Sequence, residues 1–182
     1  LTSGDYNTAV GNSAMTSCTT GAKNTALGRN SLGTLTTGTN NTAVGRNSLF
    51  ESTTGSKNTA IGDNAGFNLT TGSHNVALGE EALLTATTVD ANVAIGRQAL
   101  KVTVGSQNTA VGNQAMLANT TGANNVAVGI NALAANTTGD YSVAIGRNAL
   151  AANTTVDTNV AVGYGTLQAN STGGANTALG YA

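Results

Sequence analysis

The amino-acid sequence predicts an all-β fold, a parallel β-solenoid (β-roll) of about eleven 17-residue coils. Three observations lead to this prediction. One nine-residue phrase recurs along the chain, its glycine keeps a nearly constant spacing, and residues within it alternate in character with a period of two. We interpret residues 1–182 as a single repeat domain and as a segment of a longer fibrous protein, because both ends fall inside a repeat.

The length of the repeat follows from the glycine of the phrase, which reads "NTAVGNSAM" at 7–15 and "NVAIGRQAL" at 92–100. Nine of the ten intervals between successive glycines span seventeen positions and one spans sixteen; the glycines are Gly11, Gly28, Gly45, Gly62, Gly79, Gly96, Gly112, Gly129, Gly146, Gly163 and Gly180. A one-residue deletion in the connector between Leu100 and Gly105 explains the short interval. Seventeen extended residues supply about 56 Å of path, which suits one coil with two short strands and two corners.

The alternation within the phrase predicts which residues fill the coil. Counting the asparagine of the phrase as position one, positions two and four are Thr or aliphatic, and we expect them to form an interior column: Thr8/Val10, Val76/Leu78, Val93/Ile95, Val143/Ile145 and Val160/Val162. Position three is always Ala and points the other way, where we expect another backbone to approach. Position nine, from Met15 to Leu167, predicts a second interior column, broken at Gly66 with Phe67 as its expected filler.

The corners have their own residue types. Gly at position five predicts a bend with positive φ. Asn at position one, replaced only by Ser142, can bond turn backbone or stack as an amide ladder. At the Thr-Thr-Gly corner, Val89 and Val156 replace the glycine, and a β-branched residue resists left-handed geometry. For that corner we therefore make no prediction of a positive φ.

Composition excludes several classes of function. Charged residues make up 8% of the chain and the formal net charge is −1, so there is no basic stripe for nucleic acid. The sequence contains no apolar run long enough to span a bilayer, and we expect no direct membrane contact. A solenoid with uncapped ends requires flanking domains or symmetric partners to protect its edges.

The phrase carries a family resemblance. "SVAIGRNAL" at 142–150 closely resembles the head repeat of trimeric autotransporter adhesins, and similar repeats with "NTTG" connectors occur in bacteriophage fibres. The resemblance covers all eleven units, although the repeat is longer here than in adhesin heads. It implies a left-handed roll, a side-by-side homotrimer, and an extracellular place on a cell surface or virion fibre. It further implies attachment to a host-surface receptor or glycan.

The residues independently make a trimer reasonable. Ala and Gly in every coil predict a surface that another chain could approach closely, and a thin core gains from lateral burial. The alternative interpretation is that these small residues merely fit inside a narrow coil.

No residue is assigned a catalytic, cofactor-binding or metal-binding role, and we expect no enzyme. His74 lies at a variable connector position, and we expect it to be an exposed surface residue. A catalytic role would need a side chain that orients the imidazole, and its repeat offers none. Glu80 and Glu81 are interpreted as solvated charges and not as an acid/base pair. Cys18 has no partner for an intrachain disulfide and is expected to be half-buried. No Cys/His cluster indicates zinc.

Two other functions are considered. Stacked Thr pairs such as Thr19/Thr20 and Thr137/Thr138 would form ladders for ice binding, but adjacent residues cannot both face outward from a flat strand. Glycan binding could use connector residues such as Gln107, Asn124 and Tyr141. The chain also contains Asn-X-Ser/Thr sequons, the acceptor pattern for N-glycosylation, and we interpret them as by-products of Asn/Thr-rich connectors. Their asparagines are Asn40, Asn68, Asn119, Asn136, Asn153 and Asn170.

Overall fold

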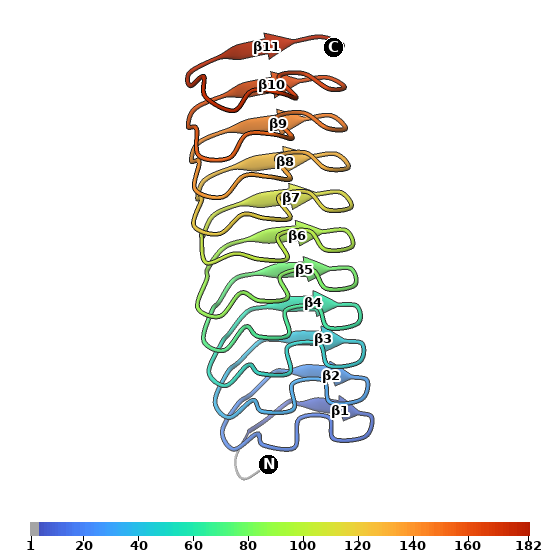
Figure 1. Ribbon diagram of the computed structural model, residues 1–182. Helices are drawn as coiled ribbons and strands as arrows, with labels where there is room; N and C mark the ends of the chain where they lie inside the picture. The colour runs from blue at the N-terminus through green and yellow to red at the C-terminus, as the bar shows by residue number, and fades with distance from the viewer. Residues whose placement is uncertain (1–3) are drawn as a thin grey trace.

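The computed structural model describes residues 4–182 and confirms the parallel β-solenoid. Eleven three-residue strands form one sheet in chain order, and the described residues contain no helix (Figure 1). The strands are β1 (Thr8–Val10), β2 (Thr25–Leu27), β3 (Thr42–Val44), β4 (Thr59–Ile61), β5 (Val76–Leu78), β6 (Val93–Ile95), β7 (Thr109–Val111), β8 (Val126–Val128), β9 (Val143–Ile145), β10 (Val160–Val162) and β11 (Thr177–Leu179).

Every strand pairs in parallel with its neighbour at the same repeat position. Val76 lies beside Val93, for example, and Ala77 beside Ala94. β6 and β7 keep this register across the shortened repeat, with Val93 opposite Thr109. The shortened connector closes locally instead, where the N–H of Gly105 donates to Thr103 Oγ1 at 3.1 Å. Length changes are thus absorbed outside the sheet.

Each coil contains one strand, so the prediction of two strands per coil is wrong. The remainder consists of turns in which residues other than glycine adopt positive φ at positions seven, nine and seventeen, as in Gln98 (φ 59°), Leu100 (φ 47°) and Gln107 (φ 63°). Left-handed geometry costs an ordinary residue about 1–2 kcal/mol. Bonds between coils offset this cost, since the N–H of Leu100 donates to Ala115 O at 3.0 Å.

The interior of the coil is the reverse of the predicted one on the strand side. The central alanines of β2 to β10 are at most 2% exposed, whereas the first and third residues of the strands point outward. Positions two and four therefore do not form an interior column, and position three is not an outer surface. Alternation predicts which residues share a face but not which face is inside. The larger side chains were the predicted interior, but the thin coil has room only for alanine there.

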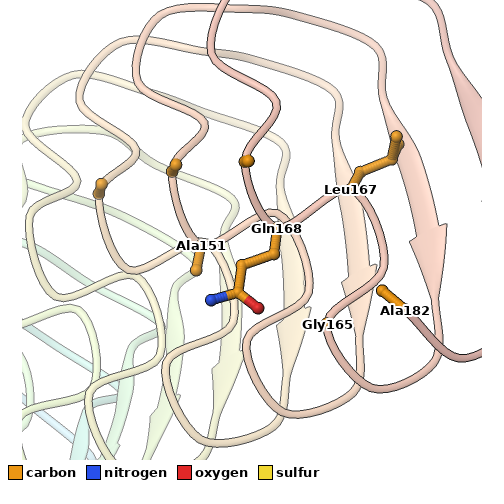
Figure 2. A pocket seen from close by; sticks show the side chains of 8 residues that line it. Ala151, Gly165, Leu167, Gln168 and Ala182 are labelled. Carbon is orange, nitrogen blue, oxygen red and sulfur yellow. The ribbon is translucent and has the colours of Figure 1, made fainter.

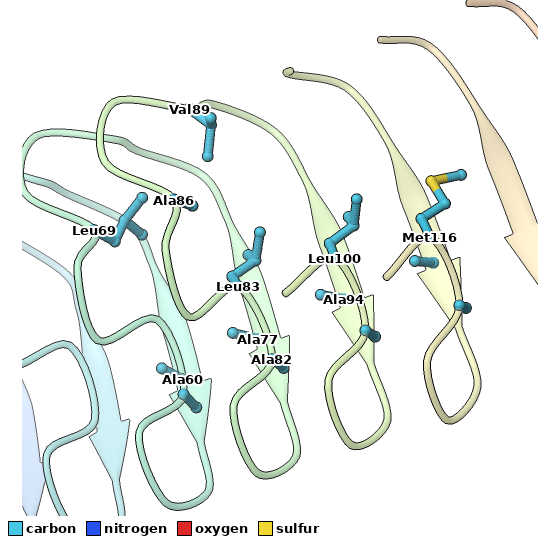
Figure 3. Packing of buried hydrophobic residues seen from close by; sticks show 14 of the residues in the cluster. Ala60, Leu69, Ala77, Ala82, Leu83, Ala86, Val89, Ala94, Leu100 and Met116 are labelled. Atoms are coloured by element: carbon cyan, nitrogen blue, oxygen red, sulfur yellow. The ribbon is translucent and has the colours of Figure 1, made fainter. Parts of the chain in front are cut away.

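The second predicted column, at position nine, is confirmed. Leu83, Leu100 and Met116 are fully buried and lie opposite the strand alanines (Figure 3). A Cβ added at Gly66 would lie 2.9 Å from Leu49 Cδ2 and 3.8 Å from Ala60 Cβ, which places the leucine column directly against the alanine column. This contact explains why the strand contributes only a methyl group to the core.

Phe67 does not fill the gap that Gly66 leaves in the leucine column, contrary to expectation. It is half-buried, lies outside the core cluster, and stacks on Phe50 of the preceding coil with ring centroids 5.5 Å apart. Both rings occupy position ten, so the pair is a ladder on the side of the rod.

The asparagines at position one hold successive coils together. The Nδ2 of Asn92 donates to Gly105 O at 3.0 Å, and its Oδ1 accepts the N–H of Asn108 in the next coil at 2.9 Å. In the same column Asn41 Nδ2 donates to Asn24 Oδ1 at 3.2 Å, so both predicted uses of this residue, turn bonding and an amide ladder, are confirmed. The glycines at position five also stack, with φ near 130° and backbone contact between coils, so the predicted bend is present.

A fourth interior column, at position twelve, changes character along the rod. It contains Cys18, Leu35, Ser52 and Leu69 in the first coils, and buried asparagines in the later ones. Asn136 donates to Asn119 Oδ1 at 2.8 Å and to Gly139 O at 2.9 Å. The rod therefore has an apolar interior near its start and a second amide ladder near its end.

Candidate functional site

One regular surface of the rod is the sheet face, which we define as the outward side chains of the first and third residues of β1 to β11. These residues are Thr or Val at the first place and Val, Leu or Ile at the third. None carries a charge. Their exposure follows from the inward alanines: Val10 is 55% exposed, Leu27 48%, Ile61 43% and Ile145 40%.

The sheet face is regular because all ten strand pairs are in register. The strands stack one after another along the rod (Figure 1), so the outward side chains of the sheet face form two files. With about 4.8 Å between strands and about 10 Å along a three-residue strand, the face measures about 50 Å by 10 Å. An uncharged apolar area of this size is typical of an interaction surface.

Two edges border the sheet face. The downstream edge is position six, two residues after each strand: Asn12, Arg29, Arg46, Asp63, Glu80, Arg97, Asn113, Ile130, Arg147, Tyr164 and Tyr181. The upstream edge is positions sixteen and seventeen, which precede each strand, as in Ser56 and Lys57 before β4. Most of the charged residues of the chain lie on these edges, which gives the apolar face a polar rim.

Neighbouring coils pair their charges along the downstream edge. Arg46 Nη2 lies 2.7 Å from Asp63 Oδ2, and Arg97 Nε lies 3.2 Å from Glu80 Oε2. The hydrogen bond from Arg46 lowers the pKa of Asp63. Surface pairs of this kind contribute little to stability individually.

Aromatic stacking continues the downstream edge in the later coils. Tyr164 and Tyr181 stack with centroids 5.1 Å apart, and the guanidinium of Arg147 lies 5.8 Å from the centre of the Tyr164 ring. Tyr164 is 41% exposed and Tyr181 83%. The edge therefore changes from ion pairs to aromatic contacts along the rod.

Along the upstream edge, side-chain carboxylates accept hydrogen bonds from backbone N–H groups of the preceding coil. Asp90 Oδ1 accepts the N–H of Ser73 at 2.7 Å, and Asp140 Oδ1 accepts the N–H of Ala123 at 2.7 Å. Position seventeen has positive φ in every coil, which directs variable side chains outward. His74, Gln107, Asn124 and Tyr141 occupy this position and are exposed, so the predicted surface placement of His74 is confirmed.

Glu80 and Glu81 lie in a turn and contact different partners. Glu80 pairs with Arg97, while Glu81 Oε2 accepts from Lys101 Nζ at 2.8 Å and from Gln98 Nε2 at 2.9 Å. The hydrogen bond from Lys101, followed by that from Gln98, lowers the pKa of Glu81. The two carboxylates therefore belong to two separate ion pairs.

The connector residues separate into buried and exposed types. Cys18 is only 2% exposed, so the expectation of a half-buried thiol is wrong. Asn119, Asn136 and Asn153 are fully buried, whereas Asn40 is exposed. In the Thr pairs, the first hydroxyl bonds the next coil, as Thr137 Oγ1 does to Thr154 O at 2.9 Å, and the second residue is exposed.

One cavity of about 720 Å³ lies near the last coils (Figure 2). Its lining is mainly alanine with one polar side chain, that of Gln168; the other lining residues are Ala135, Ala151, Ala152, Gly165, Leu167, Ala169 and Ala182. The lining includes no titratable side chain. Among residues 4–182, no three His, Cys, Asp or Glu side chains gather closely enough to hold a metal ion.

Comparison of the chain with protein-family models, with curated proteins and with solved structures finds no match. In the part of the chain that the structure describes, no helix could cross a membrane. The candidate site therefore rests on geometry alone. Sequence reasoning missed the sheet face because it placed these side chains inside; the invariant alanine at position three was the signal that could have located it.

Proposed function

We propose that the chain is a non-enzymatic structural and adhesive rod, in which three copies pack side by side with their sheet faces toward a common axis. The observation that carries this proposal is the uncharged face along the entire sheet, in which one file is wholly aliphatic and the other is made of Thr and Val. Leaving such a face in water is costly, since apolar burial is worth about 25 cal/mol per Å².

The area supports self-association. The sheet face contributes about 500 Å², and an edge column about 5 Å wide on each side raises this to about 1,000 Å² per copy. In a ring of three this area is divided between two neighbours, so each interface buries about 1,000 Å² in total, which is about the lower bound for a specific interface. The basis for association differs from the predicted one, because the surface offered to a partner is aliphatic and the small residues lie inside.

We further propose that this rod belongs to an extracellular fibre, either a cell-surface adhesin or a virion fibre, that attaches to a host-surface receptor or glycan. The resemblance of the phrase to adhesin head repeats and phage fibre repeats supports this role. The variable exposed residues of the upstream edge, including Gln107, Asn124 and Tyr141, are suitable for contacting a glycan from the outside of the assembly.

The mass in solution tests the assembly. One copy has a mass of 17.8 kDa, so a trimer has 3 × 17.8 = 53.4 kDa. Light scattering after gel filtration is expected to give the trimer. Ile145→Lys places a charge on the sheet face and is expected to yield monomers. Thr155→Lys, at an exposed corner of the same coil, is the matched control and should remain trimeric. A folded wild-type monomer would contradict the proposal.

Ice binding is a second candidate, favoured by one observation. Thr8, Thr25, Thr42 and Thr59 form an outward file on a flat sheet, a more regular array than the corner Thr pairs considered from the sequence. The bulky Leu and Ile in the adjacent file favour burial against protein. Thermal hysteresis measured on the wild type and on Ile145→Lys separates the two candidates. Ice binding requires the sheet face to be exposed, so it predicts hysteresis in the wild type, whereas a trimer that buries this face predicts none.

A further inference from the structure

We propose that the corner between the coils of β5 and β6 binds the acetamido group of an N-acetylated sugar. This inference rests on the proposed attachment to a glycan, and it names the chemical group recognised and the residues that bind it. It is carried by the shortened connector after Leu100, which leaves backbone donors of the β5 coil without the carbonyl that binds their counterparts in regular coils.

The regular Thr-Thr-Gly corner shows what these donors bind. The N–H groups of Thr120 and Thr121 donate to Thr137 O in the next coil, both at 2.9 Å. The N–H of Gly122 at 3.2 Å and the hydroxyl of Thr120 at 2.8 Å donate to the same oxygen. Successive N–H groups that converge in this way form a concave site for an oxygen acceptor.

Thr87 and Thr88 carry the same donors, but here the donors are open. Their counterpart in the next coil is Val104, whose corner is one residue shorter, and the carbonyl of Val104 accepts neither N–H. Within residues 4–182, no acceptor is bonded to the N–H of Thr87 or Thr88 or to the Thr87 hydroxyl. Both residues adopt the bend of the regular corners and are exposed, so a ligand oxygen can reach the donors.

Two exposed valines lie beside the open donors. Val104 is 60% exposed and Val102 39%, and among residues 4–182 they are the only large exposed apolar side chains outside the sheet face and its edges. Val104 occupies the repeat position of Thr87 one coil further on, which places it about 4.8 Å along the rod. An acetamido group offers one carbonyl oxygen to the donors and one methyl group to the valines.

The surrounding charges favour a neutral ligand. Converging N–H groups also suit an anion, but the nearest charge along the chain is the carboxylate of Asp90, two residues after Thr88. Lys101, three residues before Val104, is already paired with Glu81 at 2.8 Å. A carboxylate or sulfate would therefore be repelled, whereas the uncharged carbonyl of an amide would not. An extended peptide would need a row of backbone partners, and this corner offers donors to one oxygen.

The site remains accessible in the proposed trimer. Thr87 and Thr88 lie outside the sheet face, so association through that face leaves them free. Gln107, on the upstream edge of the same coil as Val104, is exposed and carries an amide that can bond the hydroxyl groups of a sugar ring. Each trimer would present three copies of the site.

Amide NMR spectra of the full chain, titrated with N-acetylglucosamine, test the site. The backbone amide resonances of Thr87 and Thr88 are expected to shift as the sugar is added. Glucose lacks the acetamido group and is expected to leave both resonances unchanged.

Thr154 and Thr155 provide an internal control in the same spectra. Within residues 4–182 their backbone N–H groups also have no bonded acceptor, but Ser171 occupies the place that Val104 has beside Thr87. Because the apolar contact is absent there, the resonances of Thr154 and Thr155 should shift less.

Two variants separate the donors from the valines. Insertion of one threonine between Val104 and Gly105 restores the regular repeat length and is expected to place the Val104 carbonyl over the open donors. Binding should weaken about tenfold or more, because the sugar loses its hydrogen bonds. Val104→Thr keeps the backbone and the side-chain shape, and should weaken binding about fourfold through loss of an apolar contact. Thr138→Val, at a regular corner, is the matched control and should bind as wild type does.

The site is wrong if the sugar shifts neither Thr87 nor Thr88, or if glucose shifts them equally. It is also wrong if the response survives the threonine insertion in a chain with a well-dispersed amide spectrum. A glycan array separates this site from the proposed function. Binding only to glycans without acetamido groups would overturn the site and leave the attachment standing. Binding to no glycan, by a chain of trimeric mass, would overturn both the site and the glycan attachment.

Discussion

The side-chain amide oxygen of Asn92 accepts the backbone N–H of Asn108, one coil further on, at 2.9 Å. The same contact recurs between Asn75 and Asn92 and between Asn108 and Asn125. Each asparagine also closes a turn in the next coil through its Nδ2. One asparagine side chain thus provides a donor for a turn carbonyl and an acceptor for the backbone N–H of the residue that precedes the next strand. The asparagines Asn92 and Asn108 are fully buried.

Asn108→Ala is expected to lower the free energy of unfolding by about 1–3 kcal/mol, because it leaves the N–H of Asn125 buried without a partner and removes one of the two donors to Gly122 O. Asn108→Ser should cost less. The native Ser142 shows how, since its Oγ accepts the N–H of Asn159 at 3.2 Å. Denaturant unfolding followed by circular dichroism gives both values, and equal losses in the two variants would show that the retained acceptor is unimportant.

Ala94→Leu is expected to destabilise the rod by about 1–3 kcal/mol, since the side chain would have to enter a closely packed interior. Ala94 is fully buried beside the leucine column. The control Ile95→Val changes the next residue, which faces outward. In the monomeric Ile145→Lys variant it should lower the free energy of unfolding by well under about 1 kcal/mol. Unfolding midpoints at equal protein concentration provide the comparison; an unchanged midpoint for Ala94→Leu would contradict the inward orientation.

Gly96→Ala is expected to cost about 2 kcal/mol or more, because the position combines positive φ with a close backbone contact. Gly96 has φ 127°, and an added Cβ would lie 2.5 Å from Gly112 O. Gly55→Ala is the control: its Cβ would meet Gly72 O at 2.6 Å, but its φ is not in the left-handed region. Valine already occupies the equivalent position at Val89. Thermal unfolding should show the larger shift for Gly96→Ala.

The carboxylate of Glu81 gives the rod a pH-dependent contribution. Its pKa is lowered by hydrogen bonds from Lys101 and Gln98. A depressed pKa means that the stabilisation is complete above the ordinary value of 4.5 and is lost as pH falls through the lower folded value. The stability difference between wild type and E81Q should therefore be constant near neutral pH and shrink below about pH 4.5. K101M should show the same convergence, and a difference that grows in acid would contradict the assignment.

The buried sequons should resist modification in the folded rod. A soluble N-glycosyltransferase is expected to modify Asn40, which is exposed, and to leave Asn119, Asn136 and Asn153 unmodified, because these three side chains lie inside the coil. Peptide mass spectrometry maps the sites. Denatured chain provides the control, in which all four asparagines become accessible. Modification of Asn136 in the native rod would require its coil to open.

The sequence predicts the architecture through its period, since the regular spacing of the position-five glycines defines the coil and its stacking. It also predicts the buried leucines and the role of Asn92, because each has a side chain suited to one environment. It does not predict which face of Val93–Ile95 is inside. Valine and alanine are both apolar, and the choice depends on the space left beside the leucine column, which lies directly against the strand alanines. The edge charges become meaningful only once the sheet face is known to be outside.

The shortened connector after Leu100 leaves the pairing of Val93 with Thr109 undisturbed. Gain or loss of a whole repeat would therefore change the length of the rod by about 4.8 Å while preserving the interior columns and the outward files. The number of repeats therefore sets the reach of such a rod without altering the cross-section of any coil.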